Sequence, residues 1–315
     1  MLHRYSGDRF REHFGTSADG NTTRRYGLDT SGAVSYRFDA LGFRRGESAA
    51  SPSGIYACGC SYTFGEGLNF EASWPHLFSS QYGRHGHGGP GVTNFSQGGA
   101  SNAYIARTLI TQSTAVPPAV VIVLFSHIGR TEYYVSREER ERVRVPAWSP
   151  VRPENLGTVA VVPKYSANWF KRRFITARLP AGFRNLGSRV LSWTRHYYLR
   201  TYTDLRAVAE SLTNMLALQY FCESRGIEFL VSWVDHACLE ETWVREHPAV
   251  APMVKLLNAE RFVDFSLLDD GVLVDRAADG WHPGPESNAI FARRMWERFE
   301  RLASKKPRAS VAASA

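Results

Sequence analysis

The sequence predicts an α/β fold in which helices cover both faces of a mainly parallel sheet. Three apolar runs read as buried strands: "GIYACG" (54–59), "AVVIVLFS" (119–126) and "IEFLVSW" (227–233). The run at 119–126 is continuous and β-branched, which is typical of a strand covered on both faces. Segments with helical spacing lie between and after these runs, and such alternation of strands and helices favours a parallel sheet.

The remaining elements follow from local patterns. In the polar first 50 residues, Val34, Tyr36 and Phe38 alternate with polar residues, as in an edge strand. The other expected elements are a helix over 73–83 with Ser73 as its N-cap, a strand from 91 that runs into a turn at Gly98, helices over 103–114, 204–226 and 251–260, a short strand over 262–266 and a last helix over 284–303.

The length suits one large domain or two small ones, and the composition is that of a globular protein. The chain has 315 residues, of which 43% are hydrophobic and 22% charged. We expect a lead-in segment at 1–50, the main domain at 51–303 and a disordered tail at 304–315. There is no apolar run long enough to span a membrane and no secretory signal. The four cysteines form neither a disulfide framework nor a zinc pattern, so we expect a cytoplasmic protein without metal or cofactor.

Positive charge is concentrated in one segment. The net charge is +8, but residues 136–200 carry 14 Lys and Arg against 4 Glu, so the rest of the chain is slightly acidic. Cations and aromatics interleave in this basic insertion, as in "WFKRRF". It is interpreted either as a lid over a crevice, as a polyanion- or nucleic-acid-binding surface, or as a partner or membrane-surface contact. Because no nucleic-acid-binding motif is present, the lid is favoured and nucleic acid is not an expected partner.

Three strand ends are candidates for a ligand crevice, because ligands bind outside the carboxyl ends of parallel strands. These are Ser61, the turn at Gly98, and Ser126 with His127. A serine hydroxyl needs a base to become a nucleophile. The G-x-S-x-G elbow is not matched around Ser61, so a turn or cap serine is the alternative. The neighbouring Cys60 is a second candidate nucleophile.

A base for Ser61 is available near the other end of the chain. The loop "DGWHPG" (279–284) places Asp279 and His282 three residues apart, just before the last predicted helix. Such a loop can present the carboxylate to one imidazole nitrogen and leave the other for a hydroxyl. A capping Asp and a surface His are the alternative for the loop alone.

Taken together, these motifs resemble the SGNH/GDSL hydrolases over about 55–135 and 203–302. The resemblance implies a three-layer α/β/α sandwich with a mainly parallel five-stranded sheet of flavodoxin-like type. It also implies that Ser61 is the nucleophile, that Asp279 and His282 complete the triad, and that the backbone N–H groups of Ser61 and of Gly98 or Gly99 stabilise the oxyanion.

Two positions depart from the family pattern. Cys60 stands where the family has an Asp outside the triad, and "FSHIGRTE" stands where the family has Gly-x-Asn-Asp. A subset of SGNH-like proteins has GCS-[FY]-T-x-G, GG-x-SN and a later Arg-x-Glu, which Arg130 and Glu132 match. We therefore expect Asn102 to replace the missing oxyanion Asn, with a helix-capping role as the alternative.

The predicted function is a serine esterase that cleaves an ester of a saccharide or a small metabolite, with O-acetyl esters among the expected substrates. His127, Arg130 and Glu132 are expected to contact the substrate, whereas Asp235 and His236 are regarded as peripheral. The alternatives are an acyltransferase with the same triad and a non-catalytic polyanion-binding module that uses the basic insertion.

Overall fold

A computed structural model describes residues 22–25, 33–39, 43–46, 54–87, 91–128, 130 and 204–305. Glu132, the basic insertion at 136–200, much of the lead-in segment and the tail from 306 lie outside the described residues. The predicted domain boundaries stay a prediction, although strands from the lead-in join the same sheet as the main domain.

Five parallel strands form the centre of the sheet, as expected. In spatial order they are β5 (Val92–Asn94), β4 (Ile55–Gly59), β6 (Val120–Phe125), β7 (Glu228–Trp233) and β8 (Phe262–Val263). With β4 first in sequence, this is the flavodoxin-like order 2-1-3-4-5, in which the connection reverses direction next to β4. The carboxyl end of β4 is therefore the expected place for a ligand crevice.

Three further strands extend the sheet antiparallel beyond β5. They are β3 (Arg44–Arg45), β2 (Ala33–Phe38) and β1 (Thr22–Arg25). The apolar side of β2 is buried, which confirms the alternation read from the sequence. The prediction that β2 is an edge strand is wrong, because β1 pairs with its outer side.

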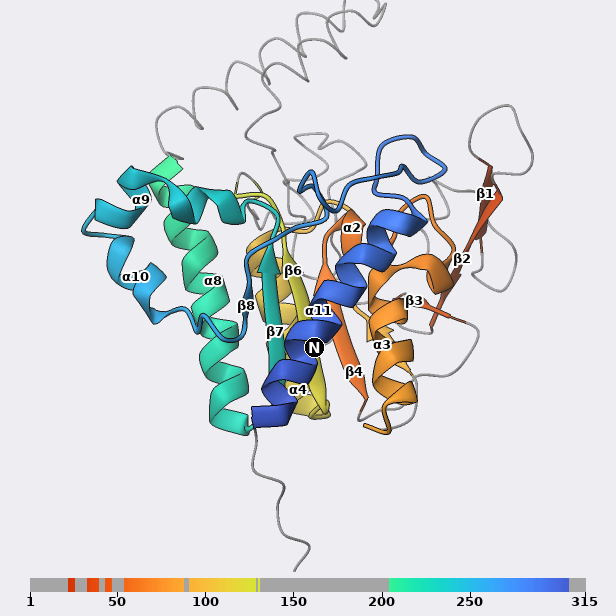
Figure 1. The fold of residues 1–315 in the computed structure, drawn as a ribbon, viewed down its shortest axis with the longest axis horizontal. Helices are drawn as coiled ribbons and strands as arrows, with labels where there is room; N and C mark the ends of the chain where they lie inside the picture. The colour runs from red at the N-terminus through yellow and green to blue at the C-terminus, as the bar shows by residue number, and fades with distance from the viewer. Residues whose placement is uncertain are drawn as a thin grey trace, which may run out of the picture.

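Helices cover both faces of the sheet, which confirms the three-layer architecture (Figure 1). On one face α3 (Trp74–Arg84) packs with α11 (Pro285–Lys305), and on the other α4 (Asn102–Ala115) packs with α8 (Asp204–Arg225). The short elements are α2 (Ser61–Phe64), η2 (Phe70–Ala72), η4 (His236–Glu240), α9 (Thr242–Glu246) and α10 (Ala251–Leu256). None of the described helices is both long enough and apolar enough to cross a membrane.

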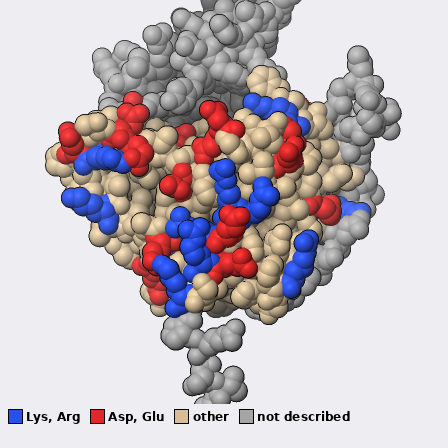
Figure 2. All heavy atoms as spheres, in the orientation of Figure 1, with Lys and Arg blue, Asp and Glu red and all other residues tan. Residues whose placement is uncertain are grey.

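Successive residues along a strand belong alternately to the two hydrophobic cores, one on each face of the sheet. In β4, Tyr56 and Cys58 belong to the core under α4 and α8, whereas Ile55 and Ala57 belong to the core under α3 and α11. All six residues of β6 are buried, as its apolar run predicts. Lys, Arg, Asp and Glu are interspersed on the solvent side of α11 (Figure 2), so this face carries no single-sign field.

Glycine is required at the end of β4. A Cβ at Gly59 would lie 2.6 Å from Thr63 Cβ and 2.8 Å from the Leu124 carbonyl oxygen. We expect Gly59→Ala to lower the free energy of unfolding by about 1–3 kcal/mol through overpacking, as measured by urea titration. Gly271→Ala is the matched control, because its Cβ would meet only the flexible end of Arg294 at 3.2 Å. Equal stability of the two variants would contradict this prediction.

Candidate active site

The candidate nucleophile lies on a tight turn between β4 and α2. The N–H groups of Thr63 and Phe64 both donate to the Cys60 carbonyl, at 3.1 and 2.9 Å, and Gly65 ends the short helix with φ +77°. Ser61 is 5% exposed at this turn, whereas Cys60 is fully buried in the core under α4 and α8. Cys60 is therefore not accessible to a substrate.

A buried arginine holds the segment that follows the nucleophile. Arg44 of β3 is 2% exposed, and its guanidinium donates to the carbonyl oxygens of Phe64, Gly65 and Leu68. The same group lies 4.7 Å from the ring centroid of Tyr36 and 5.0 Å from that of Phe64. These contacts fix the backbone from the end of α2 to residue 68.

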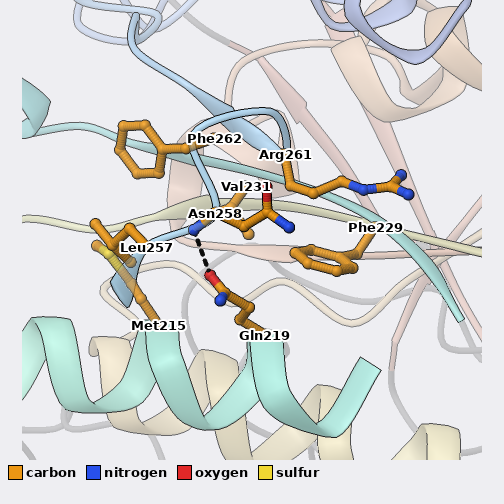
Figure 3. Close-up of a pocket in the computed structure, with 8 residues that line it drawn as sticks. All are labelled: Met215, Gln219, Phe229, Val231, Leu257, Asn258, Arg261 and Phe262. Atoms are coloured by element: carbon orange, nitrogen blue, oxygen red, sulfur yellow. Dashed lines mark hydrogen bonds between the residues drawn. The ribbon is translucent and has the colours of Figure 1, made fainter. Parts of the chain in front are cut away.

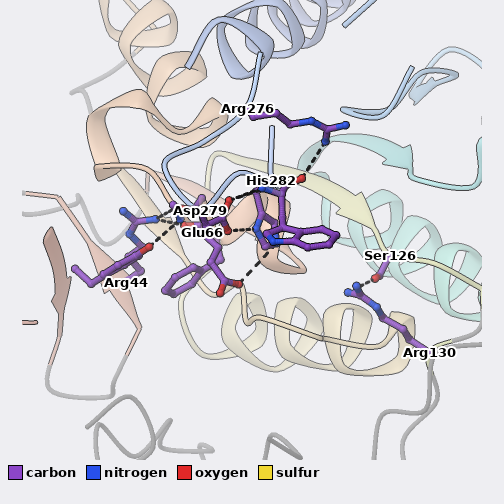
Figure 4. A network of polar contacts seen from close by, with 12 residues as sticks. Arg44, Glu66, Ser126, Arg130, Arg276, Asp279 and His282 are labelled. Atoms are coloured by element: carbon purple, nitrogen blue, oxygen red, sulfur yellow. Dashed lines mark hydrogen bonds and ion pairs between the residues drawn. The ribbon is translucent and has the colours of Figure 1, made fainter. Parts of the chain in front are cut away.

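The carboxylate and imidazole of "DGWHPG" form a preorganised pair (Figure 4). Asp279 Oδ2 lies 2.5 Å from His282 Nδ1, and Asp279 Oδ1 accepts from the N–H groups of Trp281 and His282 at 2.9 and 3.0 Å. The His282 carbonyl accepts from the Ala277 N–H at 2.8 Å. The local turn therefore orients the carboxylate toward its own histidine.

Asp275 anchors this loop to the last helix. Its carboxylate accepts from the N–H groups of Glu286 and Ser287, at 3.0 and 2.9 Å, and from the Ser287 hydroxyl at 2.6 Å. A carboxylate beside the first turn of a helix satisfies N–H groups that have no partner within the helix. Asp275 thus ties the chain before the Asp279–His282 loop to the helix that follows the loop.

The loop that carries Asp279 and His282 (the acid–base loop) contacts the segment from Ser61 to Leu68 (the nucleophile segment) directly. The Ala278 N–H donates to the Gly67 carbonyl at 3.1 Å. Gly67 has φ +79°, and a Cβ there would lie 3.1 Å from Asp279 Cγ, so glycine allows the close approach. The Tyr62 ring, next to Ser61 in the chain, lies 5.6 Å from the His282 ring. Asp279 and His282 therefore lie against the segment that follows Ser61.

The hydrogen bond between Ser61 and His282 is not formed in this arrangement. Among the described residues, the Ser61 hydroxyl makes no hydrogen bond, and His282 Nε2 lies 3.7 Å from Glu66 Oε2 (Figure 4). The same Glu66 oxygen lies 3.5 Å from the position that a Cβ on Gly98 would occupy. Glu66 is not among the residues predicted for the site, although it belongs to "GEG" directly after α2.

Three backbone N–H groups are available for an oxyanion. Within the part of the chain that the structure describes, the N–H groups of Ser61, Gly98 and Gly99 have no hydrogen-bond acceptor. Gly99 has φ +76°, and no atom lies within 4 Å of a Cβ placed there, so this turn is open. Peptide N–H groups in such positions can stabilise developing negative charge.

Asn102 connects three elements. Its Oδ1 accepts from the Ser126 N–H at 2.7 Å, and its Nδ2 donates to the Ser211 hydroxyl at 2.9 Å. The N-cap of α4 is Ser101, whose hydroxyl accepts from the Tyr104 N–H, so the alternative of a capping Asn102 is wrong. The role of Asn102 as an oxyanion donor stays a prediction.

The other predicted contact residues lie beyond the ends of β6 and β7. His127 Nδ1 lies 2.9 Å from Asp235 Oδ1. The Arg130 guanidinium donates to the Ser126 hydroxyl at 2.8 Å, as Figure 4 shows. Asp235, regarded as peripheral from the sequence, is thus the partner of His127. The position of Asp235 at the end of a strand, in "WVDH", is the feature of the sequence that places it at this edge of the sheet.

A metal cluster or a pocket away from this sheet edge would be a further candidate site among the described residues. They contain no group of three or more His, Cys, Asp or Glu side chains that could hold a metal ion. A small pocket between α8 and the β7–β8 edge is lined by Met215, Gln219, Phe229, Val231, Leu257, Asn258, Arg261 and Phe262 (Figure 3). Within this pocket Gln219 Oε1 accepts a hydrogen bond from the Asn258 N–H at 2.8 Å, which is a structural contact.

The Arg44 clamp predicts a specific loss of stability. Arg44→Met leaves three buried carbonyl groups without this donor, so we expect the free energy of unfolding to fall by about 3–5 kcal/mol. The measurement is urea unfolding followed by tryptophan fluorescence. Arg45→Met is the matched control, since the neighbouring Arg45 is exposed. A loss no larger than that of the control would show that the clamp is dispensable.

The Asp279–His282 pair predicts a dependence of stability on pH. Burial raises the pKa of Asp279, but hydrogen bonds from the His282 ring and from two N–H groups outweigh it, so this pKa lies below its ordinary value. A lowered pKa adds stability above the unfolded-state value of about 3.9, and this is lost as pH falls through the folded-state value.

We therefore expect the free energy of unfolding to fall more between about pH 5 and pH 2 in the unmodified protein than in Asp279→Asn. Urea titrations at a series of pH values measure this difference. Asp270→Asn, at an exposed position, should keep the slope of the unmodified protein. Parallel pH profiles for the unmodified protein and Asp279→Asn would contradict the role of this pair in stability.

Comparisons with known proteins find similarity at the level of solved structures. No family model and no curated protein matches the sequence. TesA is 16% identical with a TM-score of 0.43, and the match covers 79% of this chain and 98% of TesA. The esterase EstA from Pseudoalteromonas sp. is 14% identical with a TM-score of 0.40, covering 80% and 99%.

A GDSL-like lipase from Bacteroides thetaiotaomicron is 11% identical with a TM-score of 0.35, and the match covers 82% of this chain and 92% of the lipase.

Proposed function

We propose that the chain is a serine esterase in which Ser61 is the nucleophile, His282 the general base and Asp279 the group that orients His282. One observation carries this proposal: the Asp279–His282 loop docks on the segment that directly follows Ser61, through the Ala278 N–H and the close approach of Asp279 to Gly67. A serine and a base with its own carboxylate at one sheet edge are what nucleophilic acyl transfer requires.

The Asp279 carboxylate favours one tautomer of His282. Since hydrogen bonds hold the pKa of Asp279 below its ordinary value, the carboxylate is ionised at neutral pH. It accepts a hydrogen bond from His282 Nδ1–H at 2.5 Å. The other nitrogen, Nε2, then carries the lone pair that a general base needs.

In the proposed reaction, Ser61 Oγ forms a bond to the ester carbonyl carbon and its proton passes to His282 Nε2. The C–O bond to the alcohol then breaks, and the alcohol leaves with that proton. Water hydrolyses the acyl-serine by the same two steps. We assign the oxyanion to the N–H groups of Ser61 and of Gly98 or Gly99, and to the Asn102 Nδ2 hydrogen that is not donated to Ser211.

The Glu66 carboxylate lies beside the nitrogen that Ser61 needs. Glu66 Oε2 is 3.7 Å from His282 Nε2, and the Ser61 hydroxyl must form a hydrogen bond to this nitrogen before proton transfer. Catalytic hydrogen bonds are often long or unformed without substrate and form in the reactive complex. We therefore assign the present arrangement to the resting site.

Within this proposal, the substrate is a small-molecule or saccharide ester, with an O-acetyl ester as the first candidate. His127, Arg130 and Glu132 are proposed as contacts to the substrate. A planar guanidinium such as Arg130 suits a carboxylate or phosphate group on the substrate.

The test is hydrolysis of p-nitrophenyl acetate together with labelling by a fluorophosphonate. We expect Ser61→Ala and His282→Ala to lower kcat/KM at least about a thousandfold, because triad residues act as a unit. Peptide mapping should find the label on Ser61. Cys60→Ala is the matched control, since this neighbouring thiol is buried and should keep both activity and labelling. Turnover of Ser61→Ala at the unmodified rate would refute the assignment.

A further inference from the structure

A second carboxylate–imidazole pair lies at the same sheet edge and is not used by the proposed triad. His127 follows β6 and Asp235 follows β7, and these two strands are paired neighbours. Asp235 Oδ1 lies 2.9 Å from His127 Nδ1, and Asp235 Oδ2 accepts from the Ile128 N–H at 2.6 Å. Two donors therefore hold this carboxylate in place.

The pair leaves one ring nitrogen of His127 available. Burial raises the pKa of Asp235, but the hydrogen bond and charge of His127 and the Ile128 N–H outweigh it, so this pKa lies below its ordinary value. In the neutral imidazole, Nδ1–H donates a hydrogen bond to the ionised carboxylate, and Nε2 then carries a lone pair. Nε2 has no hydrogen-bond partner among the described residues, and the His127 side chain is 29% exposed.

This nitrogen lies close to the candidate active site. The ring of Tyr62 lies 6.2 Å from the His127 ring and 5.6 Å from the His282 ring, edge-on to both. Tyr62 directly follows Ser61, and β4 and β6 are paired up to Gly59 and Leu124. The rings of His127 and His282 therefore both contact the side chain that directly follows the candidate nucleophile.

We propose that His127, oriented by Asp235, binds a hydroxyl group of an alcohol at this site by accepting its proton in a hydrogen bond at Nε2. An imidazole with its proton fixed on Nδ1 is an acceptor, and a hydroxyl is the neutral donor that matches it. This inference rests on the proposed esterase function and deepens it. It selects esters of diols, polyols and saccharides over esters of simple alkanols.

Two kinds of molecule can supply the hydroxyl that His127 binds, and both donate the same kind of hydrogen bond. It belongs either to the alcohol part of the ester or to an alcohol that accepts the acyl group from Ser61. Two acetates of similar size separate hydroxyl recognition from ester hydrolysis in general: glycerol monoacetate, which has two further hydroxyls, and propyl acetate, which has none.

The experiment measures acetate release from both esters. We expect the unmodified protein to prefer glycerol monoacetate, and His127→Phe to lower the ratio of the two kcat/KM values about tenfold, as expected for loss of a good hydrogen bond. The loss should appear mainly in KM for glycerol monoacetate. His127→Gln, which keeps an acceptor oxygen, should restore part of the ratio.

Two further variants separate binding from a structural role. Asp235→Asn should lower the ratio in the same direction, since Asp235 acts by positioning His127. His85→Phe, at the exposed end of α3, is the control and should leave the ratio unchanged. Glycerol acetate formed from propyl acetate and glycerol, and lost in His127→Phe, would assign the hydroxyl to an acceptor. An effect confined to glycerol monoacetate hydrolysis would assign it to the substrate.

An unchanged ratio in His127→Phe, or an equal loss of kcat/KM for both esters, would overturn the inference. Labelling of Ser61 by the fluorophosphonate reports the proposed function independently. If Ser61 is labelled and the ratio does not respond to His127, only the hydroxyl site is refuted. If Ser61 is not labelled and neither ester is cleaved, the esterase proposal fails and the hydroxyl site fails with it.

Discussion

The position of the candidate nucleophile depends on one buried cation. Arg44 comes from the antiparallel part of the sheet, yet its guanidinium binds the carbonyl groups at the end of the helix that Ser61 begins. Cations at a helix C-terminus complement the partial negative charge of unpaired carbonyl groups. Aromatic rings of Tyr36 and Phe64 cover the same group. The lead-in strands thus support the nucleophile segment directly.

The Arg44 contacts also affect the loop that carries His282, because that loop packs on Gly67. Arg44 binds the carbonyl of Leu68, and the neighbouring Gly67 receives both the Ala278 N–H and the close approach of Asp279. A shift of the nucleophile segment would therefore move the surface on which the acid–base loop rests. The loop is also fixed at its far end, where Asp275 binds the start of α11. Ser61 and His282, 221 positions apart in sequence, are held by the same short stretch of backbone.

The sequence predicted what depends on local pattern. Continuous apolar runs identified β4, β6 and β7, and helical spacing identified α8 and α11, because a buried strand or an amphipathic helix needs such residues along its length. The polar contacts were not predictable in this way. Asp235 meets His127 across 108 positions, and Arg44 looked like one of several arginines in a polar lead-in. Such pairs are defined only once the order of the strands is known.

Glu66 places a carboxylate next to two groups of the proposed reaction. Its carboxylate lies between His282 Nε2 and Gly98, so negative charge on an oxyanion at Gly98 would be repelled by it. Its backbone cannot move freely, because the Glu66 N–H donates to the Ser61 carbonyl at 3.0 Å. The side chain, in contrast, is 25% exposed. A rotation confined to this side chain would therefore remove the carboxylate from His282 Nε2 and from Gly98 while the hydrogen-bonded backbone stays in place.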